Sequence, residues 1–348
     1  MADTTSYRLA LIGFGAVGQG LAQILRYHSD WLAQRYGVAL RIVAVYTRGR
    51  GSLYDSAGLD PATLLEEIAR VGHLHDLPAH SDHDPLEIIE RSGADVLVEV
   101  SPTNLATGEP ATQYIRAAIA RGMHVVTANK GPVALRFAEL RHLANDAGVY
   151  FGFEGTVMSG TPALRMAWSD LAGCELIELS GIVNGTTNYI LTQMEQGKSY
   201  ADALAEAQQL GYAEADPSGD VEGHDAAAKA LILANVVMDA DLGLDSVECI
   251  GISGLTSEMI AAAAAAGERW KLLARVWREG ERVRASVSPV RLSLSHPLAN
   301  VGGVTNAITF TTDLLGDVTL IGPGAGGVAT GFALLSDILA MHLLWAGG

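Results

Sequence analysis

The chain has 348 residues, of which 49% are hydrophobic and 18% charged, so it is long and apolar enough to build two domain cores. Its 23 basic and 39 acidic residues give a formal net charge of −16, which repels phosphate backbones and anionic lipids and argues against nucleic-acid and membrane partners. Cys174 and Cys249 are too few for a disulfide framework, and the N-terminus lacks the pattern of a signal peptide. We therefore expect a cytoplasmic globular protein whose partners are small molecules.

The first element is a short apolar strand over residues 8–12, followed by the sequence G-F-G-A-V-G and by apolar residues at helical spacing. Gly13 permits a tight turn, Gly15 lets the backbone approach a pyrophosphate, and Gly18 lets helix and strand pack closely. The start of the helix adds free N–H groups and a positive dipole end. This pattern predicts dinucleotide contacts from the turn residues Gly13, Phe14, Gly15, Ala16, Val17 and Gly18.

The second strand, residues 41–46, is expected to end near the adenosine ribose. A site that prefers NAD usually places Asp or Glu there, about twenty residues past the glycines, to accept the 2′-hydroxyl. This chain reads T-R-G-R-G-S over residues 47–52, with Arg48 and Arg50 and no acid. Because a guanidinium pairs with a 2′-phosphate, the sequence favours NADP, with NAD as the alternative. Two arginines on a solvated loop would look the same.

A βαβ rhythm continues through residues 95–153. We predict strands over residues 95–100, 123–127 and 149–153, and helices over residues 110–121 and 133–147. Ligands of open α/β sheets bind beyond the carboxyl ends of the strands. The candidates at these ends are Ser101, Thr103, Asn129 and Lys130. Lys130, before a Gly-Pro pair, is a candidate proton carrier or substrate anchor, and a solvated lysine is the alternative.

The middle of the chain has a different character. The turn E-G-T-V-M-S-G-T-P, residues 154–162, has closely spaced carbonyls able to coordinate a hard monovalent cation, unless the turn is only structural. An alternating strand over residues 176–183 follows, then a helix opened by N-G-T-T-N-Y-I-L, residues 184–191, and a helix over residues 200–210.

Residues 211–229 form the most unusual stretch, G-Y-A-E-A-D-P-S-G-D-V-E-G-H-D-A-A-A-K. Proline and glycine forbid a continuous helix there, so the acids sit on a folded loop that leads into a helix start. Such a loop suits a pocket for a small cationic group, although acidic Gly/Pro-rich stretches are often only solvated loops. The acids are Glu214, Asp216, Asp220, Glu222 and Asp225.

The last third is expected to be α+β and then to return to the first domain. We predict helices over residues 231–238, 252–266 and 270–277, a strand over 282–292, and a second glycine turn, G-P-G-A-G-G-V-A-T-G, opening a helix over 332–344. That turn can face the same cofactor through Gly324, Gly326 and Thr330. The expected fold class is α/β: a Rossmann-type dinucleotide-binding domain of residues 1–150 plus 305–348, with an inserted α+β substrate and dimerisation domain of residues 151–304.

Five motifs stand in the order found in homoserine dehydrogenase, which the chain resembles from about residue 8 to residue 344. They are G-F-G-A-V-G, T-A-N-K-G-P at residues 127–132, N-G-T-T-N-Y-I-L, the acidic stretch 211–229 and G-P-G-A-G-G-V-A-T-G. The resemblance implies reversible NAD(P)-linked interconversion of L-homoserine and L-aspartate 4-semialdehyde, in the pathway to threonine, methionine and isoleucine. It also implies a homodimer. Because no ACT-type domain follows the second glycine turn, we do not expect feedback control through such a domain.

The resemblance also implies roles for individual residues. The family's substrate-binding acids match Glu214 and Asp220, its catalytic pair matches Asp225 and Lys229, and Lys130 matches a further catalytic lysine. The other substrate contacts match Gly185, Thr186 and Tyr212. The family's sodium site matches the carbonyls of Glu154, Val157, Ser159 and Thr161, although many members have glycine or alanine where this chain has Met158 and Ser159.

These residue types suit a zwitterionic substrate. Acids grip its ammonium group by charge-assisted hydrogen bonds, and backbone N–H groups near Gly185 take its carboxylate. A lysine, Lys229 or Lys130, stabilises or protonates the oxygen that develops during hydride transfer. Oxidation then improves at alkaline pH, because a lysine amine is mostly protonated at neutrality. The competing hypotheses are a dehydrogenase of another small amino or hydroxy acid and a non-catalytic NADP-binding sensor.

Overall fold

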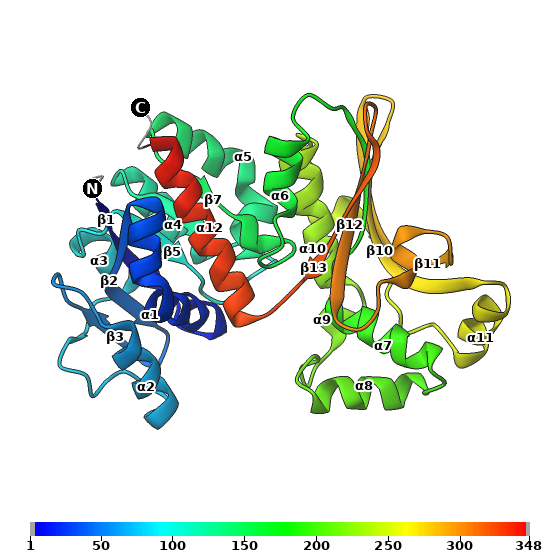
Figure 1. Ribbon diagram of the computed structural model, residues 1–348, viewed down its shortest axis with the longest axis horizontal. Helices are drawn as coiled ribbons and strands as arrows, with labels where there is room; N and C mark the ends of the chain where they lie inside the picture. The colour runs from blue at the N-terminus through cyan, green and yellow to red at the C-terminus, as the bar shows by residue number, and fades with distance from the viewer. Residues whose placement is uncertain (1–3, 346–348) are drawn as a thin grey trace. The chain divides into compact units, whose positions relative to one another are not determined.

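The computed structural model describes residues 4–345 (Figure 1). The chain divides into two compact units, the first of Met1–Gly160 with Gly326–Gly348 and the second of Thr161–Ala325. The first unit therefore takes its residues from both ends of the chain. The expected domains, residues 1–150 with 305–348 and residues 151–304, have other boundaries than these two units, as described below.

The first unit is built on a seven-stranded sheet of order β4-β3-β2-β1-β5-β6-β7. Strands β2, β1, β5, β6 and β7 run parallel, and β3 and β4 add an antiparallel edge. The order reverses between β1 and β5, the switch point at which doubly wound sheets bind ligands. This sheet confirms the predicted Rossmann-type class. The strands are β1 (Thr5–Ile12), β2 (Val38–Thr47), β3 (Gly51–Tyr54), β4 (His80–Ser81), β5 (Val96–Glu99), β6 (His124–Thr127) and β7 (Phe151–Gly152).

Helices cover both faces of this sheet, and an apolar cluster lies on each side. Because parallel strands are buried on both faces, the second half of β1, Leu9–Ile12, and the first three residues of β5 are continuous apolar runs. The helices are α1 (Ala16–Tyr36), α2 (Pro61–Val71), α3 (Pro85–Arg91), α4 (Ala111–Ala120), α5 (Lys130–Asp146) and α12 (Gly327–Trp345). α5 begins at Lys130, three residues before the predicted start, with Asn129 as its cap.

Helix α12 is packed against α1 through glycine. A Cβ on Gly20 would lie 2.0 Å from the carbonyl oxygen of Gly327, and a Cβ on Gly331 would lie 2.5 Å from the backbone nitrogen of Leu21. α12 also holds an 18-residue window with a mean hydropathy of 1.6, long and apolar enough to cross a membrane. Half of this window is buried in the first unit, as expected for a core helix.

The second unit is built on a six-stranded sheet of order β13-β12-β8-β10-β11-β9. Helices α7, α10 and α11 pack against this sheet. Its strands are β8 (Leu176–Ile182), β9 (Val247–Cys249), β10 (Glu268–Glu279), β11 (Arg282–Ser293), β12 (Thr305–Thr312) and β13 (Gly316–Pro323). Its α-helices are α6 (Ala163–Arg165), α7 (Gly185–Glu195), α8 (Tyr200–Gln209), α9 (Ser218–Val221), α10 (His224–Ile232) and α11 (Ser257–Ala265).

Two predicted elements of this region are wrong. The helix expected over residues 270–277 is part of strand β10, which pairs with β8 and β11. β10 has four buried residues in a row, Lys271–Ala274, so its sequence lacks the alternation that marks a half-buried strand. The helix expected from residue 252 begins only at Ser257, where the Thr256 hydroxyl accepts a hydrogen bond from the backbone of Met259.

The expected boundary at residue 305 also differs from the structure. β12 and β13 form a hairpin that joins the second sheet through β8, so residues 305–325 belong to the second unit. The chain returns to the first unit at Gly326. The first crossing lies between Gly160 and Thr161, ten residues after the expected one.

Candidate functional site

The glycine turn between β1 and α1 has the geometry of a phosphate-binding turn. Gly13 has φ +113°, and a Cβ there would lie 2.3 Å from the carbonyl oxygen of Val100. A Cβ on Gly18 would lie 2.6 Å from the carbonyl oxygen of Gly13, whereas one on Gly15 would meet nothing within 4 Å. Gly13 and Gly18 are therefore required by packing, and Gly15 leaves open space at the start of α1 for a ligand. Phe14 is buried in the core, so only its backbone can reach that ligand.

The second glycine turn divides between the two units. In the second unit, a Cβ on Gly324 would lie 2.0 Å from the Asn306 side chain, so packing on β12 explains this glycine. In the first unit, Gly326 has φ +125° and its carbonyl accepts the hydroxyl of Thr330. A Cβ on the next residue, Gly327, would lie 2.5 Å from the carbonyl oxygen of Ala16. The start of α12 therefore touches the start of α1.

The turn between β2 and β3 presents its two arginines to solvent. Arg48 and Arg50 are exposed. Thr47 shapes the turn, because its hydroxyl donates to the carbonyl of Gly51 at 2.9 Å and accepts from the backbone N–H of Arg50 at 3.1 Å. Both guanidinium groups thus follow the end of β2, where the adenosine ribose is expected.

The ends of β5 and β6 are joined by polar side chains. The Asn129 amide donates to the carbonyl of Ser101 at 3.1 Å, and its oxygen accepts the backbone N–H of Gly131 at 3.1 Å. Lys130 is the first residue of α5, where the positive dipole end disfavours an ammonium group. Thr103 is exposed in the loop after β5. All the predicted strand-end residues therefore lie just beyond the carboxyl ends of β5 and β6.

The acidic stretch folds as predicted into a loop and broken helices. Gly211 to Pro217 precede the short helix α9, and Gly223 with φ +85° separates α9 from α10. The acids of this stretch differ in their contacts. Asp216 accepts the backbone N–H of Ser218, which together with the Ser218 hydroxyl lowers the pKa of this carboxyl group, and Glu222 accepts the hydroxyl of Ser253. These two acids have structural partners.

Asn184 connects two of the other acids. Its amide nitrogen donates to Asp220 at 2.6 Å and to Asp225 at 3.1 Å. Its amide oxygen accepts from the backbone N–H and the hydroxyl of Thr187, both at 2.9 Å, so the side chain also caps α7. Asn184 is buried, and every polar atom of its amide is used. One amide thus holds two carboxylates from α9 and α10 beside each other.

Lys229 completes this group from α10. Its ammonium lies 2.8 Å from the Asp225 carboxylate and donates to the carbonyl of Val183 at 2.6 Å. The Lys229 side chain is only 9% exposed, so this is no solvated surface pair. An ammonium has three donors, and within residues 4–345 these two contacts are its only partners. The third N–H can therefore serve a substrate oxygen.

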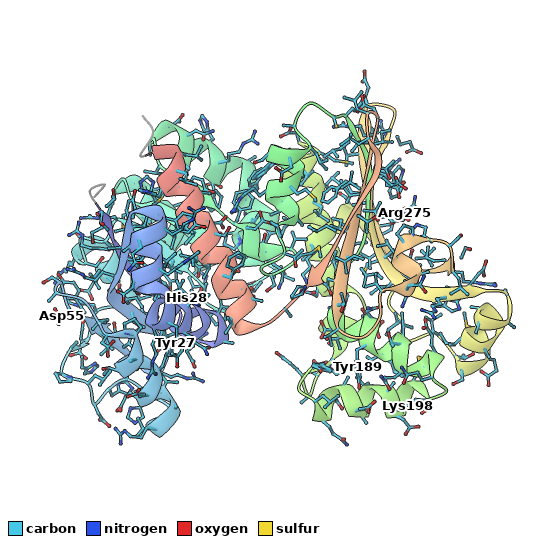
Figure 2. The ribbon with its side chains drawn as sticks, viewed as in Figure 1. Tyr27, His28, Asp55, Tyr189, Lys198 and Arg275 are labelled. Atoms are coloured by element: carbon cyan, nitrogen blue, oxygen red, sulfur yellow. The ribbon has the colours of Figure 1, made fainter. Side chains whose placement is uncertain are left out.

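Three of the remaining substrate candidates, Gly185, Thr186 and Tyr212, lie at the start of α7. The Thr186 hydroxyl donates to the carbonyl of Tyr212 at 2.6 Å, and the Tyr212 ring packs edge-on against Tyr189, labelled in Figure 2, at 5.0 Å. Among the described residues, the backbone N–H groups of Gly185 and Thr186 have no acceptor, as expected at a helix N-terminus ready for an anion. Glu214 is exposed, and its carboxylate has no hydrogen bond or ion pair within residues 4–345.

The cation candidates are buried. Glu154, Val157 and Ser159 lie in the first unit, and Ser159 has φ +53°, a conformation uncommon for a side-chain-bearing residue. The Ser159 hydroxyl contacts that of Thr330 at 2.8 Å. Thr161 is the first residue of the second unit, and its hydroxyl donates to the carbonyl of Pro323 at 2.9 Å. The turn is thus strongly bent, as a site made of carbonyls requires.

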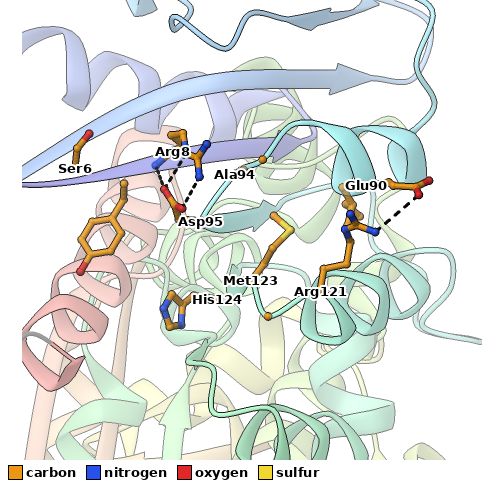
Figure 3. A pocket seen from close by; sticks show the side chains of 12 residues that line it. Ser6, Arg8, Glu90, Ala94, Asp95, Arg121, Met123 and His124 are labelled. Atoms are coloured by element: carbon orange, nitrogen blue, oxygen red, sulfur yellow. Dashed lines mark hydrogen bonds and ion pairs between the residues drawn. The ribbon is translucent and has the colours of Figure 1, made fainter. Parts of the chain in front are cut away.

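A pocket of about 490 Å³ lies at the opposite end of the first sheet, where β1, β5 and β6 begin (Figure 3). Its charged residues are already paired, Arg8 with Asp95 and Arg121 with Glu90. It contains no helix start aimed inward, and ligands of such sheets bind at the carboxyl ends of the strands. We therefore do not assign the coenzyme to this pocket.

Comparison with known families agrees with this geometry. A family model described as homoserine dehydrogenase matches residues 162–339, and one described as the NAD-binding domain of homoserine dehydrogenase matches residues 13–154. The chain belongs to the homoserine dehydrogenase family. It is therefore an NAD(P)-binding oxidoreductase.

Individual homoserine dehydrogenases are similar over nearly the whole chain. The NAD(+)-dependent homoserine dehydrogenase of Pseudomonas canavaninivorans is 47% identical over 340 residues, which are 97% of each chain. A crystal structure of a putative homoserine dehydrogenase from Archaeoglobus fulgidus gives a TM-score of 0.87 at 38% identity, covering 96% of this chain and 98% of the other. A hyperthermophilic archaeal homoserine dehydrogenase in complex with NADPH gives 0.84 at 31% identity and 98% of each chain.

Two residues of the first-sheet end and the α7 segment, Glu99 and Asn184, were not predicted as site residues from the sequence. Asn184 was noted only as part of a motif, although an asparagine directly before a helix signals a cap. Glu99 was not noted, although an acid at the end of an apolar strand is unusual. The contacts of Asn184 with Asp220 and Asp225 cannot be predicted from the sequence, and neither can the burial of Glu99, because both depend on residues distant in the chain.

Proposed function

We propose that this chain interconverts L-homoserine and L-aspartate 4-semialdehyde, using NADP or NAD. The observation that carries the proposal is the hydrogen-bonded group of buried Asn184 and Lys229 with half-buried Asp220 and Asp225, which offers an ammonium donor beside two carboxylates. A small amino acid with a reacting oxygen needs this combination. The glycine turn of the first unit supports a dinucleotide as the second reactant.

Lys229 is the proposed proton carrier. When bound, the nicotinamide exchanges a hydride with the substrate carbon. As the aldehyde is reduced, Lys229 donates a proton to its oxygen, and in the reverse direction it accepts the alcohol proton. Asp225 keeps the ammonium in place, and Val183 fixes its second donor. Lys130, which starts α5 in the first unit, is a second candidate for this role.

The substrate is held by opposite charges at its two ends. Asp220, supported by Asn184, and the exposed Glu214 take the substrate ammonium by charge-assisted hydrogen bonds. The N–H groups of Gly185 and Thr186 take its carboxylate at the start of α7. Tyr212 contacts the substrate beside them. A Cβ on Gly185 would lie 2.8 Å from the carbonyl oxygen of Val304, so this position admits only glycine without rearrangement.

An initial-rate assay tests the reaction directly. We expect oxidation of L-homoserine in the presence of NADP, and reduction of aspartate semialdehyde with NADPH, at rates far above those for other small hydroxy acids and aldehydes. Preferred turnover of another amino or hydroxy acid would replace the proposed substrate. Binding of NADPH without turnover of any of these compounds would identify a sensor instead.

The exposed Arg48 and Arg50 support NADP as the preferred coenzyme. They follow β2 with no acid between them to repel a 2′-phosphate. The relatives include examples with each coenzyme, since the Pseudomonas protein is described as NAD(+)-dependent and the archaeal structure is described as a complex with NADPH. Rates with NADP and NAD at equal concentration decide between them.

A sodium ion is the proposed cation of the turn 154–159. The support is the burial of Glu154, Val157 and Ser159 and the positive φ of Ser159. Hard monovalent cations prefer oxygen ligands, which a bent turn of carbonyls supplies. Added NaCl, compared with tetramethylammonium chloride at equal ionic strength, should raise activity or the melting temperature; equal effects of both salts would argue against the site.

We propose a homodimer that uses the second sheet. A row of five polar side chains runs across one face of five strands, and four of them are half-exposed. Arg275, labelled in Figure 2, belongs to this row and pairs with Glu178 at 2.9 Å. The row is Ser286, Arg275, Ser180, Thr309 and Thr319. A second copy stacked on this face would form a two-fold interface. Light scattering should give twice the chain mass, and Ser180→Glu should lower it.

The cytoplasm is the proposed location. Both cysteines, Cys174 and Cys249, are free thiols in the structure, as a reducing compartment would keep them. Fractionation of the source cells should recover the activity with cytoplasmic markers.

A further inference from the structure

Glu99 is a fully buried acid at the coenzyme end of the first sheet. It is the last residue of β5, and none of its surface is exposed. No ion pair is among its contacts in the part of the chain that the structure describes. An uncompensated buried carboxylate is unfavourable, and an apolar side chain of similar size would usually stabilise such a site more. Burial raises the pKa of the Glu99 carboxyl group, and the hydrogen bonds from Ser101 and Thr127 oppose the rise.

The Glu99 carboxyl group is surrounded by donors from two strand ends. One oxygen accepts the backbone N–H of Ser101 at 2.9 Å and also its hydroxyl. The other oxygen lies 3.0 Å from the hydroxyl of Thr127, which in turn accepts the backbone N–H of Asn129 at 3.0 Å. The Asn129 side chain closes the ring by donating to the carbonyl of Ser101.

This ring continues the sheet beyond its last backbone pair. Glu99 is paired with Thr127 in the parallel ladder of β5 and β6, and the chain diverges into loops directly afterwards. Side-chain bonds therefore hold Ser101 and Asn129 where ladder bonds have ended. In doubly wound sheets the second mononucleotide half binds over these strand ends, which places the nicotinamide half of the coenzyme there.

We propose that Glu99 is a positioning residue for the nicotinamide half of the coenzyme site. Through Ser101 and Thr127 it fixes the relative positions of the two strand-end loops, including Asn129 and the start of α5. It acts through these residues and does not itself touch the coenzyme. The inference rests on the proposed function for the choice of coenzyme, but it predicts an effect on binding that needs no turnover.

Fluorescence titration with NADPH tests the proposal in three variants of the full chain. Glu99→Ala removes both acceptor oxygens and should weaken NADPH binding roughly tenfold or more, about the effect of one lost hydrogen bond to a charged group. Glu99→Gln should stay within about threefold of the unmodified chain. Its amide oxygen can accept from Ser101, while its NH₂ can donate to the Thr127 hydroxyl, which is then free to donate to the backbone carbonyl of residue 99.

Thr127→Val keeps the proposal testable if Glu99→Ala does not fold. Thr127 is fully buried on β6 and so does not face the coenzyme, but its hydroxyl is part of the ring. We expect several-fold weaker NADPH binding and an unchanged KM for homoserine at saturating coenzyme. Glu67→Gln is the matched control, because Glu67 is a buried acid of the same unit whose carboxylate, among residues 4–345, bonds only to Arg70 of α2.

Two results would overturn the proposal. One is a folded Glu99→Ala or Thr127→Val chain that binds NADPH as tightly as the unmodified chain. The other is a Glu99→Gln chain as impaired as Glu99→Ala, which would mean that the hydrogen-bond ring does not carry the effect. Tight NADPH binding without homoserine turnover would contradict the proposed function and leave this binding test intact.

Discussion

The Lys229 ammonium lies 2.8 Å from the Asp225 carboxylate, one turn away on the same helix, and both are held against the segment that opens α7. An exposed pair with this spacing would add only about 0.3 to 0.5 kcal/mol to stability. Here the lysine is buried, and its remaining N–H can serve a reacting oxygen. The pair is therefore better explained by chemistry than by helix stability.

Removal of either member should abolish most turnover. We expect Lys229→Ala and Asp225→Ala each to lower kcat for homoserine oxidation by about 100-fold or more, the scale of general acid–base catalysis. NADPH affinity, measured by fluorescence, should stay within a few-fold. Lys198→Ala is the control, since the Lys198 ammonium (Figure 2) pairs with Glu206 of α8 and with no other side chain among the described residues. Near-normal rates in both catalytic variants would refute the assigned roles.

Substitutions at Gly15 of the first turn and at Gly20 of α1 should have different effects: the first should weaken coenzyme binding, and the second should lower the stability of the fold. Gly15 has φ −78° and open space around it, so Gly15→Ala should leave the melting temperature nearly unchanged while it weakens NADPH binding at least about tenfold. Gly20→Ala should instead destabilise the chain by about 1 to 3 kcal/mol, because its Cβ would overlap the backbone of Gly327. The measurement is thermal unfolding paired with NADPH titration. A lower melting temperature of Gly15→Ala would contradict the proposal that Gly15 serves coenzyme binding rather than packing.

The two arginines after β2 should set coenzyme preference. Arg48→Ala and Arg50→Ala should each lower kcat/KM for NADP by roughly tenfold and leave that for NAD within about twofold, because only NADP carries the 2′-phosphate. The ratio of the two values is the readout. An equal loss with both coenzymes would show that these side chains contact shared parts of the dinucleotide or none.

His124 should make stability sensitive to mild acid. Burial lowers the pKa of His124, which lines the pocket shown in Figure 3. Its Nδ1 accepts the backbone N–H of Tyr150 at 2.9 Å, which requires the neutral ring. The unfolded chain takes up this proton as pH falls below about 6.5, while the folded chain resists it, so stability decreases from that pH downward. His124→Asn, which keeps an acceptor, should lose a few degrees less in melting temperature between pH 7.5 and pH 5.5. An identical loss would exclude His124 as the cause.

The sequence predicted those features that depend on local pattern. Gly13 and Gly15 could be assigned because a strand, a glycine turn and a helix follow one another, and Lys229 could be linked to Asp225 by helical spacing. β10 could not be recognised, because burial on both faces removes its alternation. The joint contacts of Asn184 with Asp220 and Asp225, and the ring around Glu99, bring together residues 28 to 41 positions apart. Such contacts are decided by packing, which a single sequence does not display.

The contact between Gly20 and Gly327 also has a consequence for synthesis on the ribosome. α1 leaves the exit tunnel early, but the helix that covers it is made last. The nascent first unit must therefore wait with an uncovered apolar surface on α1 while the whole second unit is translated. We expect the second unit to acquire its structure first, and chaperones to bind α1 during that interval.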